Sequence, residues 1–511
     1  MEYKQRREPI AVNEVICDRC QEQPVDLELT LPDYCPDIQK ILKCQICPSV
    51  TSASILGDNG DISGNITVRV LYLDAAGETI RCYENTSRYD LQIPVKTVTG
   101  NGIILPRINV EYVNCRATSP RRLDIHGSFS VFARVWERRD LELLTEVEEE
   151  DVEQLRQETT FSTCAGTAQQ VIALEEVLEL GDGKPSAETL LRTDGAVLLQ
   201  ECRMSEGKLM VRGEVQLKVL YATDLREGLP EFMEYALPFQ QLIDCGRVED
   251  TAQPEVSVSV MSAVVQVKSD STGENNLLEA EVKLLATVQC YEDTTVELLT
   301  DAYSRTVEVT LDHQQRTFLQ FSGDTEEICS EKNTFQFPEG GISKVIDVWN
   351  ESCTAVVSSE NQVLQFKGKY NVCLLALNGA GKPFYFERTV ELAHQKEQGM
   401  EGPCRCYGSG EVTNLSYRIT GSDTIELKTE LRLTASLFRE VPCRYVSEVI
   451  PNPDLPKPQD EDAALVLYYA GAGESLWEIA KQYNTGSQQI CAENHLDDDV
   501  IDTAMMLLIP I

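Results

Sequence analysis

The sequence predicts a mainly β protein: three repeated antiparallel β-sandwich or barrel-like units, followed by a small α+β domain of βααβ order. Three observations predict this fold. Apolar and polar residues alternate over long stretches that are rich in β-branched and aromatic side chains. Similar stretches recur at matched spacing along the chain. The carboxyl-terminal segment departs from this pattern and shows the periodicity of two short helices.

Length and charge limit the possible functions. A chain of 511 residues is longer than one ordinary core, so several domains are expected. The 83 acidic residues outnumber the 45 basic ones and give a formal charge of −38, which argues against nucleic acid and anionic membranes as partners. The start, MEYKQRREPIAV, lacks the apolar core of a signal peptide, and no long apolar run follows. We therefore expect a cytoplasmic protein without membrane insertion.

The first half of the repeat joins a proline-led segment to a glycine-led strand. PDIQKILK begins at Pro36 and GNITVRVLY at Gly64, while PSAETLLR begins at Pro185 and GEVQLKVLY at Gly213. Both intervals span 28 residues, and in both copies a tyrosine follows the glycine by 8. A third copy, GGISKVID and then GKYNVCLLA, keeps the 28-residue interval but has Ala376 in place of the tyrosine. Matched spacing of this kind predicts a repeated structural unit.

The second half of each copy is a long alternating strand. The three stretches are GSFSVFARVW (127–136), EAEVKLLATVQCY (279–291) and LKTELRLTASLF (427–438), and LELLTE and VELLTD follow the first two. This pattern predicts half-buried antiparallel strands, and glycine-containing turns such as GDNGD and LNGAGK favour tight hairpins between them. We divide this part of the chain into three β units, 1–150, 151–310 and 311–450.

Two segments of this part are predicted to connect units. The acidic EVEEEDVEQLRQ (146–157) has a helical pattern and is interpreted as a solvated connector between the first two units. Prolines at 451, 453, 456 and 458, with acids after them, predict an extended linker over 451–463. The remaining residues, 464–511, form the terminal domain.

The terminal domain has two short helical patterns. Ser475 and Glu478 have the spacing of a capping box at the start of the first helix, which Asn484 is suited to end. Thr485 and Gln488 repeat that spacing for a second helix ending near residue 494. The apolar runs ALVLYYA and MMLLIP flank the helices as strands, and Trp477 is predicted to be central to the packing.

This terminal segment, 465–511, resembles a LysM module through GESLWEIAKQYN at residue 473 and LLIP at residue 507. LysM modules bind glycans that contain N-acetylglucosamine, such as peptidoglycan and chitin. The resemblance implies a shallow groove between two loops, whose backbone groups bind the N-acetyl group over an apolar floor. The residues it implies are Gly473, Glu474, Ser475 and Leu476 on one wall and Asp499, Val500, Ile501 and Asp502 on the other.

The second loop departs from the LysM pattern. Many members have I-x-P-G-Q, where this chain has IDTAM at 501–505. Three consecutive aspartates, 497–499, would repel anionic wall polymers. Docking of the module to a protein therefore remains an alternative to glycan binding.

The repeated part resembles the SPOCS domain of spore-forming Firmicutes. The resemblance rests on PDIQKIL, on GNITVRVLY and GEVQLKVLY, and on the later IPV (93–95) and LPF (237–239). Three such regions before one LysM module are similar to a family of clostridial spore-coat morphogenetic proteins. This implies a mother-cell protein that associates with the forespore surface and binds spore coat proteins or peptidoglycan. The long surfaces and sheet edges of the three β units predict, in addition, that the protein self-associates. A wall-anchored surface protein is the alternative, and it would need an export signal.

The sequence argues against catalysis. Its four histidines, at 126, 313, 394 and 495, do not occur in a metal-binding spacing such as HExxH. We find neither a G-x-S-x-G elbow nor a P-loop, and no acidic pair recurs between the units. The predicted function is non-enzymatic, with no cofactor.

A zinc site is the remaining alternative. CDRC (Cys17, Cys20) and CQIC (Cys44, Cys47) are CxxC pairs separated by 23 residues, a spacing close to that of zinc ribbons. Against a site, the second copy of the repeat has threonine and alanine at the positions of the CQIC cysteines. Most of the 18 cysteines are expected to be reduced, semi-buried thiols.

Overall fold

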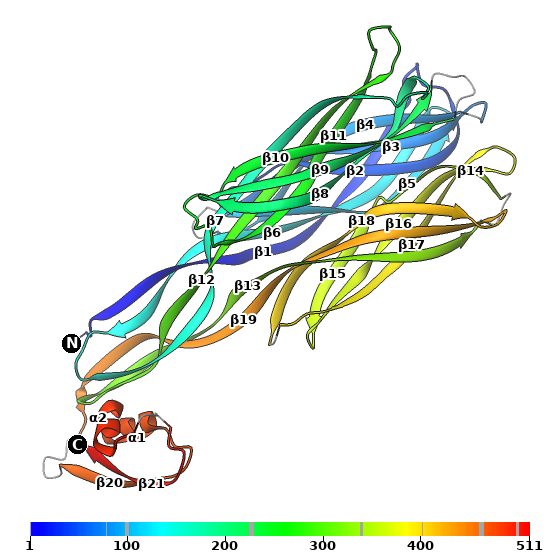
Figure 1. Cartoon of the computed structure of the whole chain (residues 1–511). Helices are drawn as coiled ribbons and strands as arrows, with labels where there is room; N and C mark the ends of the chain where they lie inside the picture. The colour runs from blue at the N-terminus through cyan, green and yellow to red at the C-terminus, as the bar shows by residue number, and fades with distance from the viewer. Residues whose placement is uncertain are drawn as a thin grey trace.

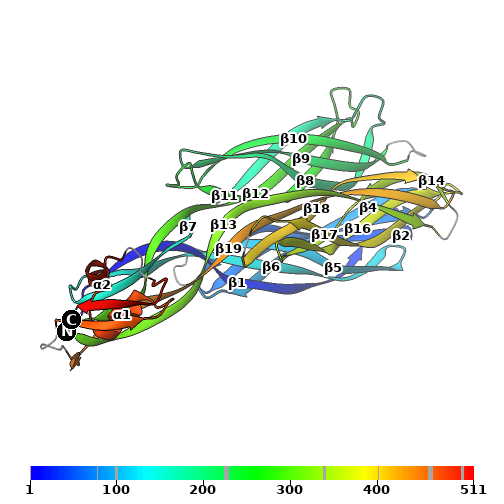
Figure 2. The same ribbon diagram turned by 60° about the horizontal axis from the view of Figure 1, so that its bottom comes forward.

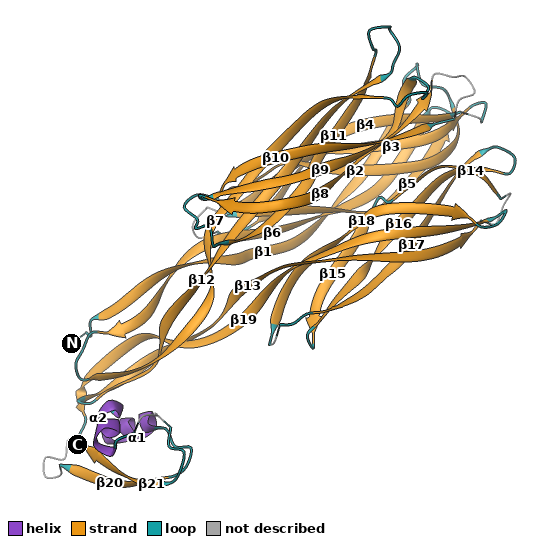
Figure 3. Cartoon of the chain, viewed as in Figure 1, coloured by secondary structure: helices purple, strands orange, loops and turns teal. Residues whose placement is uncertain are grey.

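The computed structural model describes residues 2–77, 79–97, 102–223, 229–337, 341–400, 402–458, 464–496 and 500–510. Within these ranges the chain is mainly β, with two short helices near the carboxyl end (Figure 3). The predicted fold class, repeated antiparallel sheets followed by a βααβ unit, is confirmed.

The strands before the terminal module fall into three groups. The first comprises β1 (Gln5–Thr30), β2 (Ile38–Leu56), β3 (Asn59–Asp74), β4 (Ile80–Pro94), β5 (Ile103–Ser119) and β6 (Arg122–Val147). The second comprises β7 (Val152–Glu179), β8 (Ala187–Ser205), β9 (Lys208–Thr223), β10 (Glu231–Asp244), β11 (Gln253–Lys268) and β12 (Leu277–Ser304). The third comprises β13 (Val307–Gln336), β14 (Ile342–Trp349), β15 (Cys353–Glu360), β16 (Val363–Asn378), β17 (Pro383–Glu397), β18 (Cys404–Ile419) and β19 (Thr424–Pro456).

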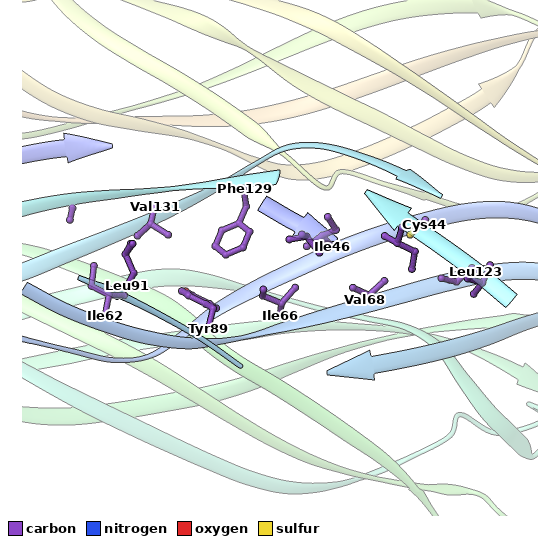
Figure 4. Packing of buried hydrophobic residues seen from close by; sticks show 14 of the residues in the cluster. Cys44, Ile46, Ile62, Ile66, Val68, Tyr89, Leu91, Leu123, Phe129 and Val131 are labelled. Carbon is purple, nitrogen blue, oxygen red and sulfur yellow. The ribbon is translucent and has the colours of Figure 1, made fainter. Parts of the chain in front are cut away.

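Each group forms two antiparallel sheets, and the strand order is the same except that two short strands, β14 and β15, take the place of β2 and β8 in the third group. The first group has β1-β6-β5 and β2-β3-β4, and the second has β11-β12-β7 and β10-β9-β8. The third has β13-β19-β18 and β14-β16-β15, with β17 paired to β16. In the first group the two sheets enclose an apolar core in which the rings of Tyr89 and Phe129 meet edge to face, 5.1 Å apart (Figure 4). Two-sheet sandwiches of this kind explain the alternation of apolar and polar residues.

The repeated glycine marks a close approach between strands. A Cβ atom on Gly64, Gly213 or Gly368 would lie 2.0, 2.4 or 1.8 Å from a backbone carbonyl oxygen of the neighbouring strand. No larger side chain fits at that distance, so the same residue type recurs in all three copies.

The repeated tyrosine holds the start of each copy. The hydroxyl of Tyr72 donates to the carbonyl of Pro36 at 3.2 Å, and that of Tyr221 donates to the carbonyl of Pro185 at 3.1 Å. Both rings are almost fully buried. The matched spacing in the sequence therefore reflects an equivalent hydrogen bond in the first two copies. Ala376 has no hydroxyl and cannot make this bond in the third copy.

The three groups meet around a common apolar cluster. Leu71, Leu220 and Leu375 each lie seven residues after a repeated glycine, and all three belong to this cluster. The sheets that meet here are β2-β3-β4, β8-β9-β10 and the sheet around β16. Equivalent positions of the three groups therefore meet in one place.

Buried charges at one repeat position join the groups. Lys43, Arg192 and Asp347 each lie seven residues after Pro36, Pro185 and Gly340 respectively. Arg192 contacts Asp347 at 2.5 Å, and both side chains are almost inaccessible to solvent. Lys43 contacts Glu351 at 3.0 Å and Glu387 at 2.7 Å. Because a buried charge without a partner is costly, these pairs favour this one arrangement of groups.

Six long strands continue beyond the sandwiches as a stalk. Figures 1 and 2 show β1, β6, β7, β12, β13 and β19 running together toward the end where the terminal module lies. Each of these strands contributes side chains to a shared apolar cluster, whose members include Ile10, Leu143, Phe161, Val296, Phe318 and Cys443. The stalk is therefore a packed element to which all three groups contribute.

Two sequence predictions about connectors were wrong. The segment 146–157 is not a helix, because β6 continues to Val147 and β7 begins at Val152. Both valines are buried in the stalk, and of the acids between them Glu148 and Glu150 are exposed while Asp151 accepts hydrogen bonds from Ser304 and Thr306. The acidic pattern therefore belongs to a turn between two strands, not to a helix. The linker also starts later than residue 451, because β19 pairs with β13 as far as Pro456. That part of β19 no longer pairs with β18 and so forms a sheet edge. Proline is tolerated at a sheet edge, because its missing N–H is not needed for pairing there.

The terminal module has the predicted βααβ order. Its elements are β20 (Leu465–Ala470), α1 (Leu476–Tyr483), α2 (Ser487–Asn494) and β21 (Met505–Pro510), with β20 antiparallel to β21. Asn484 ends α1 in the left-handed conformation, as expected. The second helix is capped at Gly486 and Gln489, one residue later than predicted, and Ser475 makes no side-chain capping bond. Among the described residues, no helix has the length and apolar character needed to cross a membrane.

Candidate binding surfaces of the terminal module

The structure brings the two predicted loops of the terminal module together. Ser475 and Val500 form an isolated antiparallel bridge. The N–H of Gly473 donates to the carbonyl of Ile501 at 2.7 Å, and the N–H of Ile501 donates to the carbonyl of Glu474 at 3.0 Å. Asp499 lies outside the described residues. The loops therefore hold each other in place with backbone groups that the LysM resemblance assigns to ligand binding.

The loop residues differ in their exposure. Leu476 and Ile501 are buried in the core of the module, so they support the loops from below. Gly473 and Asp502 are exposed, and Val500 keeps 53 % of its surface in solvent. The carboxylate of Glu474 accepts a hydrogen bond from the Tyr468 hydroxyl at 3.1 Å, which raises the pKa of Tyr468. The exposed surface here has an acidic residue on each loop, Glu474 and Asp502.

A second surface of the module was not foreseen from the sequence. The outer face of the β20-β21 sheet is apolar, and its residues, paired across the strands, are Leu465 with Pro510, Leu467 with Leu508, and Tyr469 with Met506. Leu467, Tyr469 and Met506 are 67 %, 70 % and 62 % exposed. We call this surface the apolar sheet face.

The inner face of the same sheet is also apolar. Val466, Tyr468, Ala470, Leu507 and Ile509 pack into the core with the helices. A half-covered sheet would normally alternate apolar and polar residues, so the lack of alternation in LVLYYA and MMLLIP was the signal for a second apolar surface. Contiguous exposed apolar residues mark sites where another molecule binds.

One side of the module docks on the end of β12. The indole Nε1 of Trp477 donates to an Asp301 carboxylate oxygen at 2.7 Å, and the ammonium of Lys481 lies 2.6 Å from the same oxygen. The hydroxyl of Tyr303 donates to the carbonyl of Thr485 at 2.6 Å, and its ring meets that of Trp477 edge to face. Trp477 is thus buried, as predicted, but partly by residues of the stalk.

The four cysteines of the zinc alternative are not gathered into a site. Cys17 and Cys20 lie on β1, whereas Cys44 and Cys47 lie on β2 in the opposing sheet. In the described part of the chain, one set of metal-ligand types has its atoms within 4.8 Å of one another, and it consists of Glu351, Cys373 and Glu387.

That set already has a cation. The ammonium of Lys43 contacts both of its carboxylates, and these carboxylates raise the pKa of Lys43 although burial alone would lower it. Burial also raises the pKa of the Cys373 thiol, which disfavours the thiolate that a metal ion requires. The set is therefore an ion-pair network between the first and third strand groups.

Comparison with known protein families gives two matches. Residues 37–118 and 186–270 match the family model described as SipL, SPOCS domain, and residues 468–510 match the LysM domain. No curated protein matches the chain, and no solved structure does. The SPOCS ranges cover β2 to β5 of the first strand group and the corresponding β8 to β11 of the second. Both families are non-catalytic binding or assembly domains; the SPOCS match indicates spore-coat morphogenesis and the LysM match indicates peptidoglycan binding.

Proposed function

Because the chain contains SPOCS domains of the SipL type and a carboxyl-terminal LysM domain, we propose that it is a non-enzymatic assembly protein of the spore coat. It acts on the mother-cell side of the forespore surface, where its β body serves as a scaffold and its terminal module selects the location. Several copies on one surface would give a module of modest affinity a strong combined attachment. Self-association of the body is part of this proposal.

We further propose that the three SPOCS-like units correspond to 1–150, 151–310 and 311–450, with the third unit continuing to Pro456. The same strand order in each group supports this division. The linker is then the short segment before residue 464, and the terminal module is 464–511. Its Trp477 contact with Asp301 supports a fixed position of the module on the stalk.

The apolar sheet face favours a protein partner over a glycan. A glycan offers mostly hydroxyl and amide groups, so it would leave the exposed leucine, tyrosine and methionine side chains without complementary apolar contacts. A coat protein with its own apolar patch would bury them, at about 25 cal/mol for each Å² of apolar surface removed from water. We therefore propose that this face binds a coat protein.

Peptidoglycan binding by the loops is the second candidate. Two exposed residues favour it, Gly473 and Val500, the second of which forms the bridge between the loops with Ser475. The LysM match itself also favours it. The proposed site residues remain Gly473, Glu474, Ser475, Leu476, Asp499, Val500, Ile501 and Asp502. A peptidoglycan-bound surface protein would use the same loops without the sheet face.

One experiment distinguishes the two surfaces. Full-length wild type, Leu467→Glu and Val500→Glu are each incubated with insoluble peptidoglycan and, separately, with purified coat proteins of the sporulating cell. Each substitution places one carboxylate on one exposed apolar position, so the variants control for each other. We expect coat-protein binding to fall at least tenfold in Leu467→Glu alone. Loss of that binding in Val500→Glu, with Leu467→Glu unaffected, would refute the assignment to the apolar sheet face.

Ile501→Asp would not test binding by the loops. Its side chain is 3 % exposed and lies in the module core. A buried carboxylate there would unfold the module and abolish either kind of binding.

A further inference from the structure

Two cysteines of the first strand group meet across its core. Cys44 lies on β2 and Cys115 on β5, and these strands belong to the two opposing sheets of the group. Figure 4 shows Cys44 among the side chains of the core, and Cys115 packs against the same cluster. The Cys44 thiol donates a hydrogen bond to the Cys115 sulfur. We call these two residues the inter-sheet thiol pair.

The packing of the neighbouring residues places the pair in the same way. Two residues along β2 from Cys44, the Cδ1 atom of Ile46 lies 2.6 Å from the position that a Cβ on Gly127 would take. Gly127 pairs with Val113, which lies two residues from Cys115 on β5. Side chains two residues apart on a strand point to the same face, so both cysteines continue rows that already touch. A disulfide needs its sulfur atoms about 2 Å apart, which requires only a short approach of these strands.

The two thiols differ in exposure and in acidity. Cys44 is 7 % exposed, whereas Cys115 is half-buried. The hydrogen bond from Cys44 lowers the pKa of Cys115, although burial opposes this effect. The same contact raises the pKa of Cys44, and burial raises it further. Because the thiolate is the nucleophilic form of cysteine and oxidation also requires access, Cys115 is the thiol that reacts first.

A thiol pair in the second strand group provides a comparison. Cys245 follows β10 and Cys290 lies on β12, so these residues also come from opposing sheets, and their thiols share a hydrogen bond. They are only 4 % and 0 % exposed. An oxidant therefore reaches this second pair only by entering the core.

From these observations we propose that the inter-sheet thiol pair is an oxidation site, at which hydrogen peroxide converts Cys115 and Cys44 into a disulfide. The Cys115 thiolate attacks one peroxide oxygen, the O–O bond breaks, and Cys115 becomes a sulfenic acid as hydroxide leaves. The Cys44 sulfur then attacks the Cys115 sulfur, and the sulfenic hydroxyl leaves as water with the Cys44 proton. The hydroxide takes up the proton that Cys115 lost, so one peroxide is reduced to two waters while two thiols are oxidised.

The disulfide would fasten β2 to β5 across the core of the first strand group. A bond between residues far apart in sequence restricts the unfolded chain and so stabilises the folded one. This inference concerns the β body and does not depend on what the terminal module binds.

The test treats the reduced full-length chain with a small molar excess of hydrogen peroxide and then blocks the remaining thiols. Trypsin leaves the two cysteines on separate peptides, 44–69 and 108–116. We expect mass spectrometry to find these peptides joined, at least tenfold sooner than the peptides of Cys245 and Cys290. The oxidised chain should also unfold at a higher temperature than the reduced chain. Absence of the joined peptides, or equal rates for the two pairs, would overturn the proposal.

Single variants test the order of the steps. In Cys44→Ser, Cys115 should stop at the sulfenic acid, which dimedone labels. In Cys115→Ser, the buried Cys44 should remain unlabelled, and equal labelling of the two variants would contradict the assigned roles. If a serine variant does not fold, alanine replaces serine at that position.

Cys47→Ser is the matched control, because Cys47 is the other cysteine of the 44–69 peptide. The joined peptides should form in this variant as in wild type. Their loss in Cys47→Ser, with Cys44→Ser unaffected, would assign the bond to the wrong cysteine and refute the inter-sheet thiol pair.

Discussion

Trp477 and Asp301 are joined by a hydrogen bond of 2.7 Å between the terminal module and the stalk, 176 residues apart in sequence. The same carboxylate contacts the ammonium of Lys481. One acidic side chain therefore binds two residues of α1, and it orients the module so that the apolar sheet face remains in solvent. This relationship makes the position of the module on the stalk testable by mutation.

Asp301→Ala should release the module from the stalk. The substitution removes a hydrogen bond and an ion pair that share one partly buried carboxylate, worth about 2 kcal/mol together. We expect a larger maximum dimension in small-angle X-ray scattering with an unchanged β-sheet signal in circular dichroism. Glu146→Ala is the control, because Glu146 ends LELLTE where Asp301 ends VELLTD. An unchanged scattering curve for Asp301→Ala would show that the contact does not hold the module.

Arg192→Met should destabilise the body strongly. It leaves Asp347 buried with no guanidinium beside it, a change that costs about 3 to 5 kcal/mol in comparable buried pairs. The double variant Arg192→Met, Asp347→Leu removes both charges and should recover most of the loss. Urea denaturation of the two variants measures the difference. A double variant no more stable than the single one would argue against the pair as the cause.

Gly64→Ala should destabilise the first strand group. The added Cβ would lie 2.0 Å from the carbonyl oxygen of Ser49 and 2.5 Å from the Tyr89 ring. Strands must separate to admit it, at a cost of about 2 kcal/mol or more. At Gly399 a Cβ meets nothing within 4 Å, so Gly399→Ala is the control and should change the unfolding free energy little. Equal thermal shifts in the two variants would contradict this explanation of the repeat.

The Lys43 network should make stability depend on pH in the acid range. Burial raises the pKa of Glu387, but hydrogen bonds from Lys43 and Asn371 outweigh it and hold the pKa below its ordinary value of 4.5. A group whose pKa is lowered by folding stabilises the protein above its unfolded pKa, and this contribution is lost as pH falls through the folded pKa. We expect the unfolding free energy to fall below about pH 4.5.

Lys43→Met tests the source of that dependence. Without the ammonium, the pKa of Glu387 should rise, and the part of the acid dependence that comes from this pair should disappear. Denaturation at pH 6 and pH 4 compares the variant with wild type. If the unfolding free energy changes by the same amount between pH 6 and pH 4 in both proteins, other carboxylates cause the acid dependence.

Much of the fold could be predicted from local patterns. The matched spacing of Pro36 and Gly64 with Pro185 and Gly213 predicted a repeated β unit, and the structure explains it by one hydrogen bond and one tight strand contact in each copy. The helix pattern after residue 475 likewise predicted the terminal module. The structure brings the two predicted loops of this module together through the bridge between Ser475 and Val500. It places two of the predicted site residues, Leu476 and Ile501, in the core instead of on the surface.

Other features depended on contacts between distant segments. The acids of 146–157 suggest a helix until Val147 and Val152 are seen to pack in the stalk. The quoted strand stretches end at Trp136, Tyr291 and Phe438, yet nothing local shows that these rings line one cavity.

The sequence by itself determined the repeated β architecture and the βααβ tail, because alternation, turn residues and helix caps act between near neighbours. Only the tertiary structure decided that Lys43, Arg192 and Asp347 are buried between groups, that Asp301 holds the module, and that one face of its sheet stays uncovered. These outcomes depend on which surfaces meet when the chain folds. The local pattern of apolar and polar residues indicates that a side chain tends to be buried, but not which distant segment buries it.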